Sequence, residues 1–248
     1  MAVSNDHTPP PLARDSALFL DFDGTLVDIA PTPEEVVLEA GLREALAALS
    51  AAHDGALALV SGRPIAALDA HLAPLVTAAA GVHGLELRFP DGHCESLEAS
   101  ADLTQIKTAM EHLVAANPGL RLEEKRGALG LHTRARPELE AACRARIAPL
   151  VAAEPGLTLL EGLCILEVKT ASVNKGTALR RFMEDPPFRG RRPVFAGDDV
   201  TDEDAIRATQ DLGGIAVKIG DQPSAARYRL PSAQAFRHWL LQQALGAL

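Results

Sequence analysis

Cysteine is scarce in this 248-residue chain, with three residues, an odd number. Cys94, Cys143 and Cys164 are widely separated, and no two of them form a C-x-x-C pair. Disulfide-dependent secreted proteins and zinc-binding modules both need clustered or paired cysteines. The sequence therefore predicts neither a disulfide framework nor a zinc site, and it favours a reducing cytoplasm.

Long apolar runs are also missing, since no segment approaches the roughly 20 residues that span a bilayer. We therefore expect no membrane partner. The first eleven residues include Asp6, His7 and three prolines, which is unlike a secretory signal. We interpret residues 1–15 as a disordered leader.

Positive charge is in the minority. The chain has 24 Lys and Arg against 33 Asp and Glu, for a formal net charge of −9. Nucleic-acid binders usually carry a basic surface, so this balance argues against a nucleic-acid partner. It remains compatible with a phosphorylated substrate, because a few local cations and a metal can reverse the field at a site.

Short apolar runs alternate with helical patterns over most of the chain. The expected strands are 17–20, 56–60, 78–81, 193–196 and 214–217. The expected helices are 42–49, 65–71, 175–183, 203–208 and 233–245. Alternation of this kind is typical of a parallel sheet with helices on its faces. The sequence therefore predicts an α/β fold with a Rossmann-like core.

The pattern changes over residues 102–169. The expected order there is helix, two strands, helix and two strands, at 102–115, 120–124, 128–134, 137–153, 158–160 and 164–168. The second helix is expected to begin at a proline, which is a favoured position. We interpret this α+β segment as a cap domain inserted into the core, which then comprises 16–101 and 170–248.

Two carboxylates follow the first expected strand, in Leu20-Asp21-Phe22-Asp23-Gly24-Thr25-Leu26. In open α/β sheets, ligands lie beyond the carboxyl ends of the strands. One carboxylate can attack phosphorus and form an aspartyl phosphate, while the other protonates the leaving oxygen. A pair that merely caps the next helix is the less favoured alternative, because an apolar run precedes the motif and Gly-Thr completes it.

Two further motifs suit an anionic ligand. In Val60-Ser61-Gly62-Arg63, a hydroxyl and free N–H groups can bind a phosphate oxygen, and Arg63 can pair with substrate or a cap carboxylate. Taken alone, a simple serine helix cap explains this segment better. Asn174-Lys175-Gly176 puts a lysine at a helix start, where the helix dipole disfavours a cation. Neutralising an aspartyl phosphate would explain that placement.

Carboxylates gather again after a strand in Gly197-Asp198-Asp199-Val200-Thr201-Asp202. Mg²⁺ prefers oxygen ligands and keeps several waters, so one or two carboxylates with a phosphate suffice. We expect Asp21, the main-chain carbonyl of Asp23 and Asp198 to hold Mg²⁺. Asp202 is expected to support this site. An EF-hand calcium loop does not fit, because its glycine and distant glutamate would be misplaced.

In this order, the four motifs resemble those of the haloacid dehalogenase-like phosphatases, over nearly the whole chain outside the leader. The resemblance implies a magnesium-dependent phosphomonoesterase with Asp21 as nucleophile and Asp23 as general acid and base. It further implies Asp198 as metal ligand. The phosphate and substrate ligands expected around this core are Thr25, Ser61, Gly62, Arg63, His83, Asn174 and Lys175.

Polar residues also alternate along the expected cap strands. Three pairs stand at i and i+2: Glu123 with Lys125, His132 with Arg134, and Glu167 with Lys169. This spacing puts both members of a pair on one face of a strand. Such pairs suit recognition of sugar hydroxyls, and a solvated outer sheet face is an equally open alternative.

These cap segments, together with Gly81-Val82-His83-Gly84-Leu85-Glu86, are similar to the trehalose-6-phosphate phosphatase family. The resemblance implies hydrolysis of trehalose 6-phosphate in trehalose biosynthesis, with Glu123, Lys125 and Glu167 on glucose hydroxyls. Thr170 departs from the family pattern, which commonly has proline there.

Other functions stay open. One is a related sugar-phosphate phosphatase, acting on sucrose phosphate or mannosyl phosphoglycerate, and another is a catalytically silent sugar-phosphate-binding regulator. The expected partner is a small-molecule sugar phosphate, and an association with the upstream trehalose-phosphate synthase is left open.

Overall fold

The computed structural model describes residues 7–30, 32, 35–73, 75, 78–96, 102–125, 127–162 and 164–247, with the side chains of Lys125 and Ala247 excepted. The chain divides into two compact units, Met1–Ser96 with Asn174–Leu248, and Leu97–Val173. The segment expected to form a cap, 102–169, lies inside the second unit.

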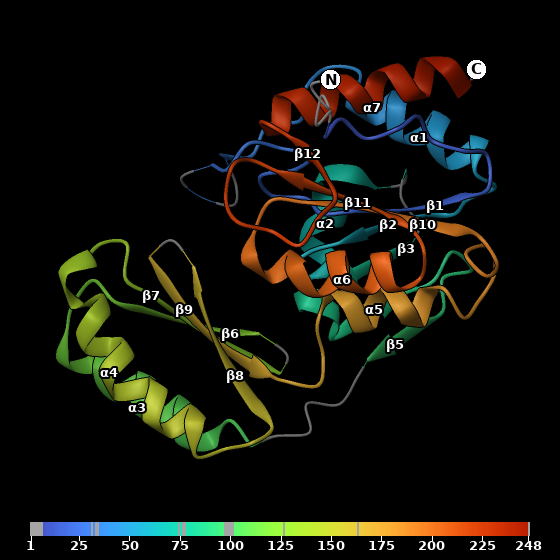
Figure 1. Cartoon of the computed structure of the whole chain (residues 1–248). Helices are drawn as coiled ribbons and strands as arrows, with labels where there is room; N and C mark the ends of the chain where they lie inside the picture. The colour runs from blue at the N-terminus through green and yellow to red at the C-terminus, as the bar shows by residue number, and fades with distance from the viewer. Residues whose placement is uncertain are drawn as a thin grey trace, which may run out of the picture. The chain divides into compact units, whose positions relative to one another are not determined.

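An eight-stranded sheet forms the centre of the first unit, in the order β12-β11-β10-β1-β2-β3-β4-β5 (Figure 1). Its strands are β1 (Ser16–Leu20), β2 (Leu57–Val60), β3 (Ala78–Gly81), β4 (Glu86–Arg88), β5 (Cys94–Ser96), β10 (Arg192–Gly197), β11 (Ile215–Ile219) and β12 (Tyr228–Leu230). Pairing is parallel from β12 to β3 and antiparallel across β4 and β5. The predicted α/β class is confirmed. The sequence did not reveal β4, β5 and β12, because three residues are too few to carry a periodic pattern.

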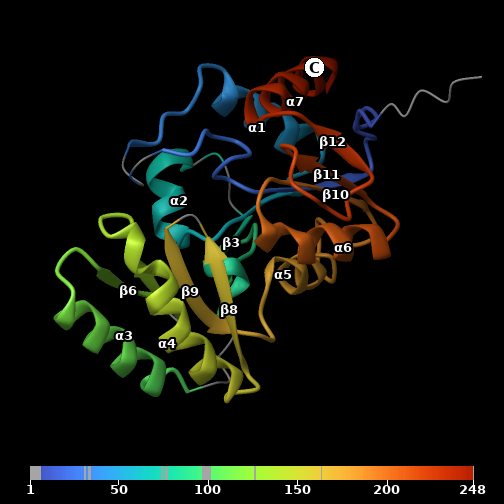
Figure 2. The same cartoon turned by 60° about the vertical axis from the view of Figure 1, so that its left-hand side comes forward.

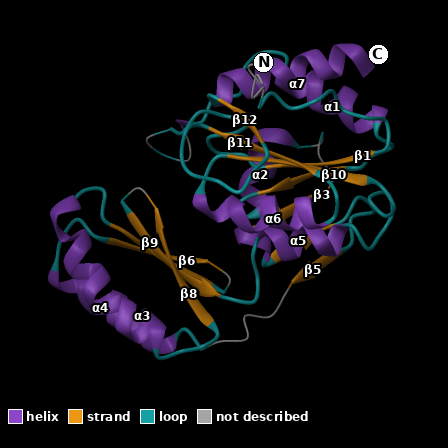
Figure 3. Cartoon of the chain, viewed as in Figure 1, coloured by secondary structure: helices purple, strands orange, loops and turns teal. Residues whose placement is uncertain are grey.

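Helices cover both faces of this sheet (Figure 3). They are α1 (Leu42–Ala52), α2 (Ile65–Leu72), α5 (Lys175–Phe182), α6 (Glu203–Asp211) and α7 (Ala233–Ala247). Apolar residues of α1, α2 and α7 pack on one face, and those of α5 and α6 pack on the other. The central strands are therefore apolar on both sides, as expected for buried parallel strands. Among the described residues, no helix combines the length and apolarity needed to cross a bilayer.

The second unit is a four-stranded antiparallel sheet in the order β6-β7-β9-β8, with two helices on one face (Figure 2). Its elements are α3 (Thr104–Ala116), β6 (Arg121–Lys125), β7 (Ala128–His132), α4 (Glu140–Ala152), β8 (Leu157–Gly162) and β9 (Ile165–Thr170). Alternate strand residues such as Leu129, Leu131 and Val168 join the apolar core under α3 and α4. The residues between them, including Gly130 and Glu167, therefore belong to the other face.

An expectation about the N-terminal segment is wrong, and the bounds of one expected helix differ. The N-terminal leader is ordered from His7 onward, where the His7 carbonyl accepts from the Arg229 N–H at 2.8 Å. Leu12 packs against the core, and its N–H donates to Gln243 at 2.9 Å; residues 1–6 lie outside the described part. The helix expected over 137–153 is confirmed as α4, except that its first turn is a 3₁₀ helix, Pro137–Leu139. Tighter turns of this kind are frequent at helix starts.

Candidate active site

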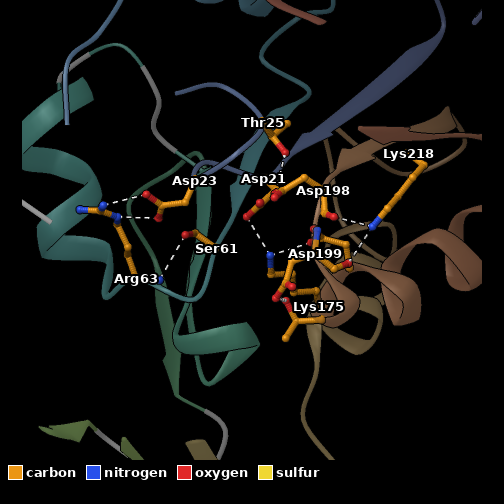
Figure 4. A network of polar contacts seen from close by, with 11 residues as sticks. Asp21, Asp23, Thr25, Ser61, Arg63, Lys175, Asp198, Asp199 and Lys218 are labelled. Atoms are coloured by element: carbon orange, nitrogen blue, oxygen red, sulfur yellow. Dashed lines mark hydrogen bonds and ion pairs between the residues drawn. The ribbon is translucent and has the colours of Figure 1, made fainter. Parts of the chain in front are cut away.

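Two neighbouring strands in the middle of the sheet bring acidic residues together at their carboxyl ends (Figure 4). Leu20 of β1 lies in register with Ala196 of β10, so Asp21 and Asp198 leave their strands close to one another. The Asp21 N–H donates to the Ala196 carbonyl at 3.0 Å and prolongs this pairing. One carboxylate oxygen from each of Asp21, Asp198 and Asp202 lies within 4.8 Å of the others. The structure therefore assembles the three carboxylates that the sequence motifs single out.

Lys175, at the start of α5, bridges two of these carboxylates. Its Nζ lies 2.7 Å from Asp21 Oδ1 and 2.6 Å from Asp202 Oδ1. All three side chains are almost inaccessible, with residue exposures of 2% for Lys175, 3% for Asp21 and 0% for Asp202. An unfavourable position at a helix start is thus offset by two buried opposite charges.

The charges within this group are not balanced. Burial raises the pKa of Asp21 well above its usual range, and the charges of Asp202 and Asp198 add to it while Lys175 opposes it. Burial, with the charge of Asp202, raises the pKa of Asp198 to about 6. For Lys175, burial alone would lower the pKa, but Asp202 and Asp21 outweigh it and raise the pKa. Three carboxylates thus gather around the ammonium of Lys175, and negative charge exceeds positive charge among these four side chains.

The residues present fit a divalent cation such as Mg²⁺, which takes oxygen ligands. Asp202 has both oxygens engaged, since Oδ1 accepts from Lys175 and Oδ2 accepts from the Asp199 N–H at 2.9 Å. Asp21 and Asp198 are therefore the better ligands, and Asp202 supports them. The Thr25 hydroxyl, expected on substrate, instead donates to Asp198 Oδ1 at 3.3 Å.

Little room surrounds the Asp198 carboxylate. Gly24 has a φ of +74°, and a Cβ at this position would lie 2.1 Å from Asp198 Oδ2. Any other residue at position 24 would be strained and would displace the carboxylate. Gly24, which follows Asp23 in the first motif, is therefore needed to leave room for the carboxylate of Asp198 in the last motif.

The side chain of Asp23, the expected general acid, is paired with Arg63. Arg63 Nε and Nη2 donate to the two oxygens of Asp23, each at 2.7 Å. The expectation that Arg63 pairs with substrate or a cap carboxylate stays a prediction. Both Asp23 oxygens are occupied by a bidentate, charge-assisted contact.

His83 contacts the segment that contains Ser61 and Gly62. The N–H of His83 donates to the Ser61 carbonyl at 2.9 Å. The His83 ring lies against Gly62, where an added Cβ would be 2.7 Å from Nε2. Ser61 Oγ accepts from the Arg63 N–H at 3.1 Å, and this hydroxyl makes no side-chain cap on α2. Ser61 and Gly62 are thus placed at the end of β2, next to β1.

Two side chains contact helix starts in ways that the sequence did not predict. Asn174, expected among the substrate ligands, caps α5, since its side-chain oxygen accepts from the Thr177 N–H at 2.9 Å. Glu86 accepts from the Ile65 N–H at 3.0 Å and so satisfies the first turn of α2. The signal for Asn174 is its place just before a helix, where asparagine is a favoured N-cap.

In the second unit, a row of residues crosses the sheet face that α3 and α4 leave uncovered. Glu123 of β6 and Glu167 of β9 both pair with Gly130 of β7 and so flank it. Glu123 Oε2 lies 2.8 Å from His132 Nε2. Glu167 is 8% exposed. The expectation that Glu123, His132 and Glu167 share one face agrees with this register.

The other cap residues are placed differently. Lys125 lies in β6, with its side chain outside the described part of the chain. The expected strand pair of His132 and Arg134 is wrong, because β7 ends at His132 and Arg134 lies in a turn. The Arg136 N–H donates to the Thr133 carbonyl at 2.7 Å, and this turn redirects the chain toward α4.

Sequence reasoning missed Lys218, which lies in β11 and is 1% exposed. Its Nζ donates to the main-chain carbonyls of Asp198 and Asp199 (Figure 4). The available signal was a single lysine between Val217 and Ile219, in a strand that is otherwise apolar. Lysine is almost never fully buried unless it is paired.

Known proteins are similar to this chain in sequence and in fold. A family model described as trehalose-phosphatase matches residues 19–234. The trehalose-6-phosphate phosphatase of Escherichia coli (strain K12) is 38% identical over 232 residues, which cover 93% of this chain and 87% of that protein. A solved structure of a trehalose-6-phosphate phosphatase related protein is 28% identical, with a TM-score of 0.74, and the match covers 92% of this chain and 97% of that one.

The same fold also occurs in a protein with a much lower sequence identity. A solved phosphatase of the haloalkanoate (HAD) superfamily from Bacteroides thetaiotaomicron has a TM-score of 0.64 at 16% identity, with 100% of this chain and 99% of that chain covered. At that identity the likeness concerns the fold alone. The predicted haloacid dehalogenase-like core is thus confirmed. Because the family model matches most of the sequence and the Escherichia coli relative matches nearly all of it, the chain belongs to the trehalose-phosphatase family.

Proposed function

We propose that this protein hydrolyses trehalose 6-phosphate to trehalose and inorganic phosphate through a phospho-aspartate on Asp21. The buried contact of 2.7 Å between Lys175 Nζ and Asp21 Oδ1 carries the proposal. It puts a carboxylate at a strand end beside a cation that can neutralise a phosphoryl group, as covalent catalysis by aspartate requires. The relatives' names, at 38% identity for Escherichia coli, support the substrate.

The residues divide the chemistry into two steps. In the first, an Asp21 oxygen attacks phosphorus, the bond from phosphorus to the sugar oxygen breaks, and Asp23 gives that oxygen a proton. In the second, Asp23 takes a proton from water, which attacks phosphorus and releases Asp21 and inorganic phosphate. Ser61 and Lys175 hold phosphate oxygens in both steps. Arg63 donates to both oxygens of Asp23 and so orients this carboxylate.

We assign Mg²⁺ to Asp21 and Asp198, with Asp202 in support. A bound divalent ion supplies positive charge that offsets the repulsion between a carboxylate and an anionic phosphate. The support for this assignment is the excess of carboxylates over ammonium groups, together with the raised pKa of Asp198.

Sugar recognition is assigned to the second unit. We infer that Glu123, Lys125 and Glu167 bind glucose hydroxyls. The support is the row in which two glutamates flank Gly130 on one face of the sheet. Carboxylates accept hydrogen bonds from hydroxyl groups. The cytoplasmic location and an association with a trehalose-phosphate synthase stay predictions.

One assay tests these proposals. Phosphate release is measured with magnesium on trehalose 6-phosphate, sucrose phosphate, mannosyl phosphoglycerate and an activated aryl phosphate. We expect the highest kcat/KM for trehalose 6-phosphate. A higher value for another sugar phosphate would contradict the substrate, and no release from any ester would favour the silent regulator.

A further inference from the structure

We propose that Lys218 is a positioning residue for the metal ligand Asp198. Its ammonium fixes the main chain at Asp198 and Asp199, and this orients the Asp198 carboxylate toward Asp21. The inference rests on the magnesium site proposed above.

Lys218 occupies a position where a charge is costly. It pairs in register with Gly197, the last residue of β10, and it follows Val217 in the apolar core of the sheet. The residue is 1% exposed. Burying an ammonium group costs several kcal/mol unless hydrogen bonds compensate. Packing alone would be served better by an apolar residue, so the contacts of the ammonium explain its presence.

Those contacts lie on the loop that carries the metal ligand. Lys218 Nζ donates to the carbonyl oxygens of Asp198 and Asp199, the latter at 3.3 Å. The Asp199 N–H donates in turn to Asp202 Oδ2 at 2.9 Å. The loop at Asp198 and Asp199 is therefore fixed by hydrogen bonds to two side chains, those of Lys218 and Asp202. The network continues from Asp202 through Lys175 to Asp21 (Figure 4).

Lys218 favours metal binding by orienting the Asp198 carboxylate, and not through its charge. A cation close to the carboxylates repels a divalent ion, so its charge alone would weaken binding. The carboxylate of Asp198, however, has little freedom, since a Cβ at Gly24 would lie 2.1 Å from it. A small shift of the Asp198 peptide would therefore move the carboxylate out of line with Asp21. Contacts that orient a ligand in this way are worth about 10- to 100-fold in metal affinity.

The test uses metal-free, full-length protein and calorimetric titration with Mg²⁺. Lys218→Met removes the ammonium and keeps an unbranched apolar chain, and we expect about 10- to 100-fold weaker binding. Arg229→Met is the matched control. Arg229 pairs in register with Lys218, and it also donates to two main-chain carbonyls, those of Gly220 and Gln222. Its removal should leave Mg²⁺ affinity near the wild-type value.

Kinetics give a second readout. For Lys218→Met, the Mg²⁺ concentration for half-maximal activity should rise by the same factor, while kcat at saturating Mg²⁺ stays close to wild type. A merely structural role would instead lower kcat or stability without changing Mg²⁺ affinity. Lys218→Gln, which keeps an N–H donor without the charge, should bind with intermediate affinity.

The outcomes separate the two proposals. Equal or tighter Mg²⁺ binding by Lys218→Met overturns the positioning role alone. If the Met variant does not fold, Lys218→Gln decides on the same criterion, and failure of both to fold makes Lys218 a structural residue and overturns the inference. No Mg²⁺ binding by wild type overturns the magnesium site itself, and the inference falls with it.

Discussion

The two units of this chain present polar groups in different places. In the first unit, helices cover both faces of a parallel sheet, so Asp21 and Asp198 gather where strands end. In the second unit, helices cover one face of an antiparallel sheet, so Glu123 and Glu167 stand within strands on the other face. Sheet type thus decides whether a site forms at an edge or on a surface.

The units also differ in how firmly they hold these groups. Lys175 and Asp202 are at most 2% exposed and joined at 2.6 Å. In the second unit, the side chains of His132 and Glu123 are 36% and 41% exposed. Buried charges depend on their partners, whereas exposed pairs contribute little. Substitutions in the first unit should therefore affect every phosphate ester, and those in the second should affect the sugar alone.

The largest expected effect comes from Asp21→Asn. Loss of the nucleophile should reduce kcat by roughly 10⁴-fold or more on trehalose 6-phosphate and on an aryl phosphate alike. Circular dichroism should show an unchanged fold. Beryllium fluoride, a mimic of the phosphorylated aspartate, should bind wild type only. Equal binding to the variant would remove Asp21 from the nucleophile role.

Asp23→Asn should separate the two substrates. A sugar hydroxyl is a poor leaving group and needs a proton, so we expect a loss of about 10²- to 10⁴-fold on trehalose 6-phosphate. An activated aryl phosphate should lose far less. Steady-state kinetics on both esters test this, and equal losses would show that Asp23 is not the acid.

Lys175→Met should reduce kcat on both substrates by about 10²- to 10³-fold, the usual cost of losing one group that stabilises transition-state charge. It should also cost about 3–5 kcal/mol in the free energy of unfolding, because Asp21 and Asp202 stay buried without a counter-charge. Since the pKa of Asp21 is raised, its protonation at lower pH should recover part of that stability.

Urea denaturation measures the stability of this variant. Lys107→Met is its control, because Lys107 is exposed and paired at 2.9 Å with the exposed Glu124. Solvent screens that pair, so its loss should change the free energy of unfolding little. A stability for Lys175→Met that matches the control would mean the buried charges do not need the ammonium.

Glu167→Ala should test the second unit. Loss of a partner for sugar hydroxyls should lower kcat/KM on trehalose 6-phosphate about 5- to 150-fold, the equivalent of about 1–3 kcal/mol. An aryl phosphate should be hydrolysed as by wild type. The control is Glu161→Ala, in the same sheet, since Glu161 is paired at 2.6 Å with Arg144 of α4. Equal losses on both esters would refute the sugar role.

The smallest expected effect is the pH dependence of Mg²⁺ binding. The pKa of Asp198 is raised to about 6 without metal, so protons compete with Mg²⁺ below that pH. Affinity should fall by about tenfold per pH unit below 6 for one competing proton. Thermal shifts on adding Mg²⁺ at pH 5 to 8 measure this. A constant shift across that range would argue against Asp198 as a ligand.

Apolar runs were enough to predict the five central parallel strands. These strands are buried on both faces, so their composition reports their position directly. Strands β4 and β12 were not predicted, because a strand of three residues is too short to show an alternating pattern. The order of the segment that begins at His7 was not predicted for another reason. Its proline-rich composition is typical of leaders, and only packing of Leu12 on the core reveals that it is held.

What the sequence determined by itself was the order of motifs, and with it the meeting of Asp21 and Asp198, since both follow parallel strands that end at one edge of the sheet. The tertiary structure decided which polar side chain contacts which. Arg63 faces Asp23, and Lys218 holds the Asp198 loop, through contacts between residues 40 and 20 positions apart. The position of a motif after a parallel strand places it at one edge of the sheet. The partners of its side chains depend on how the helices and strands pack.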